Sequence, residues 1–461
     1  MHIKFSTLLL FISTAIGISD VVVAATPSPT TKCVVPHTAD VDDSPAIMEV
    51  FTRCNVNSTI TFKAGVEYNA WSPMKWFNLT NVKIELKGAL HLPTNVTDVQ
   101  AKVVATYGTA TAPWFSIQGK NVDLVGDLSP KGGIIHGHGE GWWDAGIQAS
   151  RIDLTLQTLV SNFVLLIQAS RPLMVTFNVA TGTISKLKMI KPVAHGIRIT
   201  GTNILVTQHY VDAKHGSRDS SVGFPFNTDG FNVGGQNITI DGYYGNNGDD
   251  CVSILNGAKN VVARNGYCGF SSHGLSIGSL GSNGQNSQVS NILFENWVMD
   301  GAVYGARFKS WTGGNGLAAN ITWRNLVLRN VSTPIFITQN YYDQGKGPRP
   351  NNTAGTSTHI DNFHFENFSG YLNPSWTDGT CISDPCWNYV EGIDATQAII
   401  FDLYNGTATN LQAKNIHVRP YRAGYDDTTV ICDPATLAPG AQDTLGFKCQ
   451  DGPFVATPIV S

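Results

Sequence analysis

The feature that most constrains the fold of this chain is a repeat led by asparagine. Asn203, Asn237, Asn260, Asn291 and Asn320 each introduce a short run of alternating apolar residues, at intervals of 34, 23, 31 and 29 residues. A unit of that length suits one coil of a solenoid, in which each coil packs only on its neighbours. Helix-length periodic segments are nearly absent, and Gly and Asn punctuate the short runs. The sequence therefore predicts an all-β fold, a single right-handed parallel β-helix.

Antiparallel sandwiches and propellers are the alternative architectures. The irregular spacing and the lack of two-residue hairpin signals favour the solenoid over both. Asparagine at the corner of a coil tolerates left-handed backbone and can stack on the asparagine of the next coil.

The chain of 461 residues is long enough for two or three domains, but its composition is uniform along the sequence and no Pro/Ser-rich linker divides it. We expect one domain over residues 26–461. Residues 151–170 do not fit the repeat, because they are strongly apolar and lie between two Ser-Arg dipeptides. They could be a buried insertion or translated non-coding sequence, and both interpretations remain open.

Residues 1–25 have the pattern of a secretory signal peptide. An apolar run from Phe5 to Ile18 follows a weakly positive start, and Val23-Ala24-Ala25 offers a small-residue cleavage site. The alternative is a membrane anchor, but the run is short and no stop-transfer pattern follows. We expect a secreted protein that has no membrane partner.

The eight cysteines agree with an oxidising compartment, because they fall into four close pairs. Pairing of nearest neighbours gives Cys33–Cys54, Cys251–Cys268, Cys381–Cys386 and Cys432–Cys449, although eight cysteines allow 105 connectivities. A zinc site is disfavoured because no CxxC pair occurs. Nine Asn-x-Ser/Thr acceptors suit a glycosylated surface. They are Asn57, Asn78, Asn95, Asn237, Asn320, Asn330, Asn351, Asn367 and Asn405.

The net charge of -4 argues against a nucleic-acid partner, which usually needs a basic face. A polyanionic substrate would have to be held by local cations. We expect a monomer.

Three short stretches carry the candidate chemistry. They are Asn227–Phe231, Gly248–Cys251 and Ser272–Gly274. Asp249 follows Asp229 by 20 residues and His273 follows Asp250 by 23, so each lies about one coil, or roughly 4.8 Å, from the last. We expect one solvent-facing row in which crowding raises the pKa of one carboxyl group. A raised acid beside an ionised base is the equipment for hydrolysis of a glycosidic bond.

Asp249 and Asp250 are neighbours, and neighbours on a regular strand face opposite ways. Both can reach one site only if the backbone bends, which Asn246-Asn247-Gly248 permits. The alternatives are that one carboxylate merely caps a turn and that His273 is a buried structural histidine.

Arg307 and Lys309 are spaced i, i+2, so a strand would point both to one face, as it would Asn227 and Asp229. Two cations on one face can clamp a carboxylate. An ordinary surface charge pair is the alternative.

In these motifs the chain resembles glycoside hydrolase family 28, the polygalacturonases. The family's four signatures stand here as Asn227-Thr228-Asp229, Gly248-Asp249-Asp250, Ser272-His273-Gly274 and Arg307-Phe308-Lys309. Tyr341 aligns with a tyrosine of the family. Residues 273–281, 306–314 and 384–387 look most like the fungal exo-acting branch, the galacturan 1,4-alpha-galacturonidases. Ser272 and Phe308 depart from the family's usual Gly and Ile.

The resemblance implies an inverting hydrolase of polygalacturonate that needs no metal or cofactor. Asp249 would be the general acid, and Asp229 with Asp250 would activate water. His273 would hold Asp249 in its working protonation state. The implied substrate-binding residues are Asn227, Arg307, Lys309 and Tyr341. Loops His215–Phe226 and Tyr342–Thr358 are candidate walls for exo action.

Three other functions remain open. One is a related pectin hydrolase that acts on rhamnogalacturonan ends, xylogalacturonan or internal polygalacturonate bonds. Another is a calcium-dependent pectate lyase on the same solenoid. The third is a non-catalytic carbohydrate-binding solenoid.

Overall fold

The structure is a computed structural model. It describes residues 30–108, 112–146, 171–216, 223–342, 356–373, 389–394, 396–421 and 427–460. The predictions for residues 1–25, residues 151–170, the Cys381–Cys386 pair and the Asn351 acceptor lie outside the described residues.

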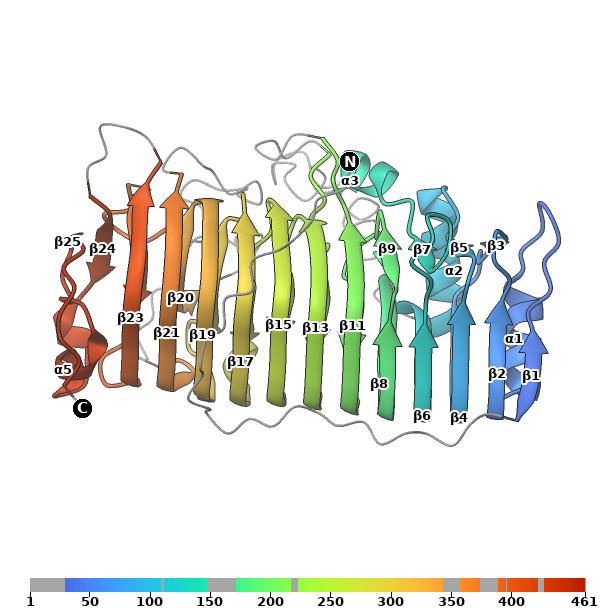
Figure 1. The fold of residues 1–461 in the computed structure, drawn as a ribbon, viewed down its shortest axis with the longest axis horizontal. Coiled ribbons are helices and arrows are strands. Elements are labelled where there is room, and N and C mark those ends of the chain that lie inside the picture. Colours follow the sequence, from blue (N-terminus) through green and yellow to red (C-terminus); the bar gives the residue numbers. More distant parts are fainter. Residues whose placement is uncertain are drawn as a thin grey trace, which may run out of the picture.

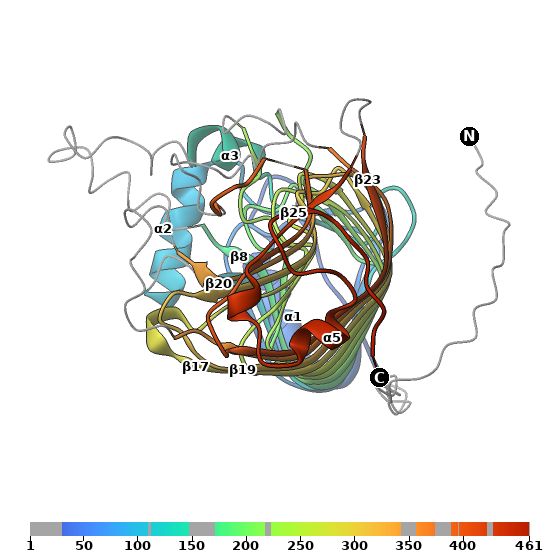
Figure 2. The ribbon, with the colours of Figure 1, turned by 90° about the vertical axis from the view of Figure 1, so that its left-hand side faces the viewer.

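The described chain coils into a parallel β-helix, as predicted, with strands of successive coils side by side along the long axis (Figure 1). Figure 2 looks along that axis and shows the wall of the tube in cross-section. One face is built from long strands, each hydrogen-bonded in parallel to the next. In chain order they are β1 Thr31–Val34, β2 Val56–Phe62, β4 Met74–Leu86, β6 Pro113–Val125, β8 Leu173–Ser185, β11 Thr202–Asp212, β13 Gln236–Asn247, β15 Lys259–Phe270, β17 Asn286–Asp300, β19 Asn315–Val331, β21 His359–Leu372 and β23 Ala408–Pro420.

Two further faces complete each coil. The second face consists of short strands that continue onto the carboxyl end of β11: β3 Glu67–Asn69, β5 Ala89–His91, β7 Ile134–His136 and β9 Lys188–Ile190. The third face consists of β10 Ile197–Ile199, β12 Phe231–Val233, β14 Val252–Ile254, β16 Leu275–Leu280, β18 Tyr304–Trp311, β20 Thr333–Tyr341, β22 Gln397–Asp402 and β24 Thr429–Cys432. Only β25, Gly452–Pro453, pairs antiparallel among the described strands.

Helices occur at the ends and on one side of the tube, which the sequence pattern did not predict. They are α1 Ser44–Arg53, α2 Val96–Tyr107, α3 Glu140–Gly146 and α5 Ala441–Leu445, with 3₁₀ turns at Ser282–Gly284 and Pro434–Thr436. At the amino-terminal end of the tube (Figure 1), α1 buries Ile47, Val50 and Phe51 on one face. Phe51 stacks on Trp76 of β4 at 4.1 Å, so α1 covers apolar side chains of the first coils. No helix among the described residues is long and apolar enough to cross a bilayer.

Two asparagine ladders confirm the predicted corners. In the first ladder, each asparagine after the first donates from its side-chain N–H to the side-chain Oδ1 of the asparagine one coil earlier. The members are Asn203, Asn237, Asn260, Asn291, Asn320 and Asn362. The second ladder runs through Asn265, Asn296, Asn325, Asn367 and Asn415. Every member has a positive φ, between 54° and 60°. The repeat in the sequence is therefore a repeat of left-handed corners that the side chains tie together.

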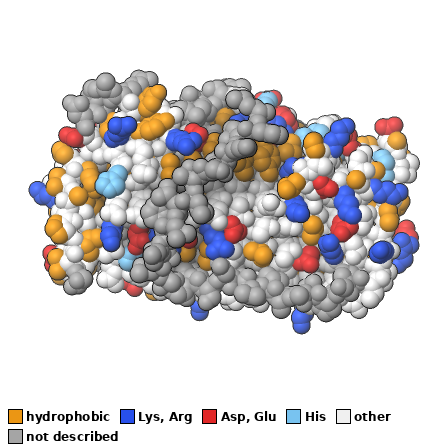
Figure 3. All heavy atoms as spheres, in the orientation of Figure 1, with side chains coloured by type: hydrophobic (Ala, Val, Ile, Leu, Met, Phe, Trp, Pro, Cys, Tyr) orange, Lys and Arg blue, Asp and Glu red, His pale blue; other side chains and the backbone are white. Residues whose placement is uncertain are grey.

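Three of the predicted disulfides are present: Cys33–Cys54, Cys251–Cys268 and Cys432–Cys449. On the face shown in Figure 3, acidic and basic side chains of the described residues are interspersed. No single-sign field covers that face, which agrees with the expectation that local cations would hold a polyanion.

Candidate active site

Asp229, Asp250 and His273 occupy equivalent positions on three successive coils. Each lies two residues before the first residue of β12, β14 or β16, and those first residues pair with one another in register. The backbone ladder continues into the turn, where the N–H of Gly230 donates to the carbonyl of Asp250 at 3.0 Å. The predicted one-coil spacing is confirmed.

The bend predicted before the paired aspartates is also present. The side-chain amide of Asn247 donates to the carbonyl oxygens of Asp249, at 2.7 Å, and of Asp250, at 3.2 Å. A Cβ atom at Gly248 would lie 2.5 Å from the carbonyl oxygen of Pro225, so only glycine fits there. Both carboxylates consequently reach the same cluster of side chains, although they are neighbours in sequence.

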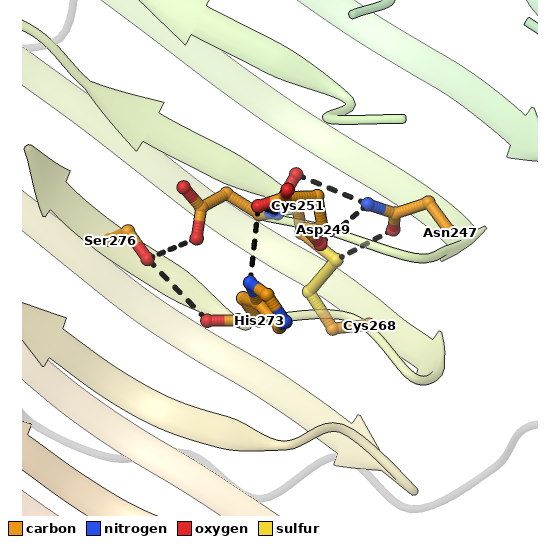
Figure 4. Close-up of a disulfide and its surroundings, with 7 residues drawn as sticks. Asn247, Asp249, Cys251, Cys268, His273 and Ser276 are labelled. Carbon is orange, nitrogen blue, oxygen red and sulfur yellow. Dashed lines mark hydrogen bonds and ion pairs between the residues drawn. A yellow bond between two sulfur atoms is a disulfide. The ribbon is translucent and has the colours of Figure 1, made fainter. Parts of the chain in front are cut away.

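Asp249 is held by two side chains and by the backbone N–H of Asp250, which donates to its Oδ1 at 2.8 Å. His273 Nδ1 lies 3.1 Å from its Oδ1, and Asn227 donates to its Oδ2 at 3.1 Å. Figure 4 shows the His273 ring pointing toward Asp249, with the Cys251–Cys268 disulfide beside them. Burial alone would raise the pKa of Asp249, but His273, Lys309 and further cationic charge outweigh it and lower that pKa below its ordinary 3.8.

Asp229 is in the opposite electrostatic situation. Asn232 donates to its Oδ2 at 2.8 Å, and His195 Nε2 lies 3.6 Å from its Oδ1. Burial and the charges of Asp249 and Asp250 raise the pKa of Asp229 well above 3.8. One carboxyl group of the row therefore has a raised pKa, as predicted, but that group is Asp229 and not the implied acid Asp249.

Asp250 is enclosed by cations. Lys309 Nζ lies 2.9 Å from its Oδ2, Arg307 Nη1 lies 3.4 Å from its Oδ1, and the Ser276 hydroxyl donates to the same Oδ1. Arg307 and Lys309 of β18 thus face one side, as their spacing predicted. In this structure they contact a carboxylate of the protein itself.

Two tyrosines complete the surroundings of these cations. The Arg307 guanidinium lies 4.6 Å from the ring centre of Tyr304, and Lys309 Nζ lies 5.9 Å from that of Tyr341. Cations over aromatic faces are stabilised by the ring quadrupole. Tyr341 therefore stands beside Lys309, and its contact with the sugar stays a prediction.

The row is less open than predicted. The side chain of Asp249 is 12% exposed, that of Asp229 is 7% exposed and that of Asp250 only 1%. The expectation of a fully solvent-facing row is wrong for Asp250, because Arg307, Lys309 and Ser276 cover it. Asp249 is the most accessible of the three.

Among the described residues, sequence reasoning missed five residues of the site, namely Arg171, His195, Asn232, Ser276 and Tyr304. Arg171 donates to Asn227 Oδ1 at 2.6 Å and to the Phe226 carbonyl at 2.8 Å. Burial lowers its pKa to about 10, against the attraction of Asp249. Arg171 directly follows the segment 151–170, which does not fit the asparagine repeat, so no motif pointed to it.

The candidate wall loops are described only in part. The described end of the first loop includes His215, whose Nε2 lies 2.9 Å from Asp144 Oδ1 in α3. Residues 217–222 and 343–355 lie outside the described residues.

Asp249, Asp250 and His273 each offer a ligand atom within 4.8 Å of the others, a geometry that could hold a metal ion. However, Lys309 and Arg307 already bring positive charge to Asp250. A cation at this position would be repelled by them, so we keep the expectation that the site needs no metal.

Comparison with known proteins identifies relatives along most of the chain. The sequence profile described as Glycosyl hydrolases family 28 matches residues 73–382. A protein of Aspergillus terreus named "Probable exopolygalacturonase C" is 38% identical over 432 residues, which cover 92% of this chain and 93% of that protein. Proteins of the same name from Neosartorya fischeri and Aspergillus niger are 37% and 35% identical, each over 92% of both chains.

Solved structures agree on the fold. The endo-xylogalacturonan hydrolase from Aspergillus tubingensis superposes with a TM-score of 0.69 at 20% identity, covering 92% of this chain and all of that one. The polygalacturonase from Erwinia carotovora ssp. carotovora gives a TM-score of 0.58 at 17% identity, covering 89% of this chain and all of that one. At these identities the likeness supports the right-handed parallel β-helix alone.

Proposed function

The chain belongs to glycosyl hydrolases family 28, and from this premise we propose that it is an exopolygalacturonase. It is a glycoside hydrolase that cuts α-1,4 bonds of polygalacturonate and releases galacturonic acid from the non-reducing end. The exo assignment rests on relatives named exopolygalacturonase at 35–38% identity over 92% of the chain. The hydrolytic assignment rests on one observation, the in-register stack of Asp229, Asp250 and His273 beside Asp249.

In this proposal Asp249 protonates the leaving glycosidic oxygen. It is the most accessible carboxylate of the row, so it is the one that a sugar can reach first. Asp229 and Asp250 activate the water that attacks from the opposite face, as an inverting reaction requires. Asp229 Oδ1 accepts no hydrogen bond from the described residues, so it is the oxygen that takes up the water's proton.

The opposite pKa shifts of Asp229 and Asp249 mean that the two carboxyl groups share one proton over a wide pH range. In the free protein this proton resides mainly on Asp229. The reactive protonation state has the proton on Asp249 and a negative charge on Asp229. Activity therefore requires that the pair hold one proton, which predicts an acidic pH optimum.

Binding of the substrate favours this rearrangement. A galacturonate carboxylate beside Lys309 competes with Asp250 for the cation, and it adds a negative charge near Asp249. Both effects raise the pKa of Asp249. Asn227 and Tyr341 line the same place and contact the sugar. The substrate's own charge thereby helps to prepare the acid.

The chain's cationic surroundings weigh against a calcium-dependent pectate lyase, because Lys309 and Arg307 occupy the position of a positive ion next to Asp250. A non-catalytic solenoid would not need three carboxylates in one cluster. A related pectin hydrolase stays the nearest alternative.

Timed chromatography of products from unesterified polygalacturonate tests the proposal. Galacturonic acid should be the product from the first time point, whereas early mixed oligomers would indicate an endo enzyme. An unsaturated, ultraviolet-absorbing product that disappears with chelator would indicate a lyase. Asp249→Asn is the matched negative control, since it changes one oxygen of the site to nitrogen.

We also propose that residues 1–25 are removed and that residues 26–461 are secreted as a monomeric glycoprotein. The oxidised cysteines of the described residues support this, because disulfides persist in extracellular proteins. The intact mass of protein from the culture medium, before and after deglycosylation, checks the cleavage and the glycans. Light scattering of the same sample checks the monomer.

A further inference from the structure

A cluster of three histidines lies on the second face of the solenoid, away from the carboxylates. His91 ends β5, and His136 ends β7 in direct register with it, one coil later. The register continues from His136 through β9 and β11 to Asn246, three coils on, which is roughly 14 Å along the tube. The register therefore places the cluster on the edge of the fold where Asn246 precedes the candidate active site, but three coils away from it.

The third histidine joins the other two through a turn. His138 lies two residues after His136 and has a positive φ of 52°. This conformation is strained for a residue with a side chain. It brings the His138 ring to 3.9 Å from that of His136, centre to centre. The backbone N–H of His138 donates to His136 Nδ1 at 3.1 Å, which fixes the turn.

The ring nitrogens of the cluster converge. Each of the three residues has a nitrogen within 4.8 Å of those of the others, and His91 Nδ1 lies 3.1 Å from His138 Nε2. Two facing imidazole nitrogens can share only one proton. In a tetrahedral zinc site with Zn–N bonds of 2.0–2.1 Å, ligand nitrogens lie roughly 3.3 Å apart. The observed separation already approaches that value, and a metal ion would satisfy both nitrogens.

The surroundings suit a cation. A cavity of about 420 Å³ opens beside the cluster and is lined by His91, His138, Glu67 and Asp98 among others. The three side chains are half-buried, so imidazoles at this position face both protein and solvent. A neutral imidazole has one ring nitrogen with a lone pair for coordination, and in His136 the backbone N–H of His138 now occupies that of Nδ1.

The formal charges near the cluster are mainly negative. The carboxylate of Glu67 attracts positive charge at His91, and that of Glu140 attracts positive charge at His138. One cation, Lys191, acts on His136. The two carboxylates thus leave a net negative field for a divalent ion.

We propose that His91, His136 and His138 bind a divalent first-row transition-metal ion of the zinc type. Three imidazole ligands with an open fourth position are a common zinc arrangement, and here the cavity lined by His91 and His138 leaves room for a fourth ligand. The ion would join β5 and β7 to the turn before α3. His136 would exchange its hydrogen bond from the His138 N–H for the metal if it coordinates through Nδ1.

The experiment uses the full secreted chain without a histidine tag, with Co²⁺ and Zn²⁺ as probes. Wild-type protein should bind one equivalent of Co²⁺ at this cluster, with the visible absorption of a tetrahedral ion. Zn²⁺ should displace it and raise Tm. His136→Asn should weaken binding by more than about 100-fold, since even groups that only support a ligand contribute 10- to 100-fold.

His417→Asn is the matched control, because His417 is an exposed histidine of β23 outside the cluster. It should bind Co²⁺ as the wild type does. His138→Asn gives a second test should His136→Asn fail to fold by circular dichroism. Equal binding by the wild type and both cluster variants, or no tetrahedral spectrum in the wild type, would overturn the proposal. So would loss of the ion in Asp250→Asn alone, because that result would place it among the carboxylates.

Discussion

His273 contacts Asp249 twice, across two neighbouring coils. Its backbone N–H donates to the Asp249 carbonyl at 2.9 Å, and its Nδ1 lies 3.1 Å from the Asp249 carboxylate. The first contact belongs to the backbone ladder and fixes the position of the ring, and the second uses that position to stabilise the carboxylate. The regular backbone of the coil thereby places the imidazole that lowers the pKa of Asp249.

The first prediction concerns the proposed acid. Asp249→Asn should lower kcat on polygalacturonate by about 10²–10⁴-fold, because it removes the group that protonates the leaving oxygen. The variant should still fold, because Asn can keep the contact with Asn227, but its Tm at neutral pH should fall because the ion pair with His273 is lost. Steady-state rates measure the effect. The control is Asp241→Asn, which alters a carboxylate paired with Arg264 on the outer wall and should keep full activity. Near-normal turnover by Asp249→Asn would refute its role.

A second prediction concerns stability. Folding raises the pKa of Asp229. Between pH 3.8 and a pH equal to the raised pKa, the native state therefore binds more protons than the unfolded state. The stability that Asp229 contributes is fully present below pH 3.8 and is lost as the pH rises through the pKa of the folded state. Asp229→Asn removes this penalty, so it should raise the free energy of unfolding at neutral pH by about 1.4 kcal/mol for each pH unit by which folding raises the pKa of Asp229, and Tm should rise with it. Below the unfolded pKa the two proteins should melt together. A variant less stable than the wild type at neutral pH would contradict the shift.

The shared proton gives a third prediction, on the pH dependence of kcat/KM. The wild type should show a bell with an acidic optimum. Its alkaline limb reports loss of the proton that Asp229 and Asp249 share. In Asp229→Asn the residual activity depends on Asp249 alone, whose pKa is lowered, so the alkaline limb should move to lower pH. An unmoved limb would mean that the pair does not share a proton.

The comparison of sequence with structure shows which features can be predicted. The positions of Asp229, Asp250 and His273 could be predicted because their spacing equals the length of one coil. The asparagine repeat gives that length. The pair of Arg307 and Lys309 could be placed because a strand has a period of two. These positions depend on regular backbone alone.

Other features depend on where irregular segments return to the solenoid, and no period encodes that. Arg171 reaches Asn227 from 56 residues away, after a segment that breaks the repeat. His91 and His138 are 47 residues apart because α2 lengthens the coil between them. The pKa values of Asp229 and Asp249 could not be assigned either, since both are buried acids and only their partners differ.

Arg171 gives a fourth prediction, as a positioning residue. Its guanidinium fixes Asn227, which in turn holds Asp249. Arg171→Lys keeps the charge but loses the two-nitrogen geometry, so kcat should fall by about 10²-fold while the pH profile stays in place. Arg171→Met also removes the charge, which should shift the profile to higher pH because both acids become harder to ionise.

The matched control for Arg171 is Arg324→Lys. Arg324 contacts Glu295 through two nitrogens, at 2.9 and 2.6 Å, on the wall of the solenoid. Its replacement should leave kcat and the pH profile unchanged. If Arg171→Lys and Arg171→Met lost activity equally with no shift of the profile, Arg171 would have a structural role only.

The last prediction tests the ladders. Asn291 donates to Asn260 and accepts from Asn320, at a φ of 59°. Asn291→Ala loses two hydrogen bonds, each of which contributes about 0.5–1.5 kcal/mol. It also places alanine, which has no polar side chain to support this conformation, in left-handed backbone, which costs about 1–2 kcal/mol. Asn283→Ala meets only the second cost, because Asn283 has a φ of 57° but lies outside both ladders. Thermal unfolding should therefore rank the wild type above Asn283→Ala and Asn283→Ala above Asn291→Ala. Equal losses in the two variants would mean that the ladder adds nothing to the backbone conformation it accompanies.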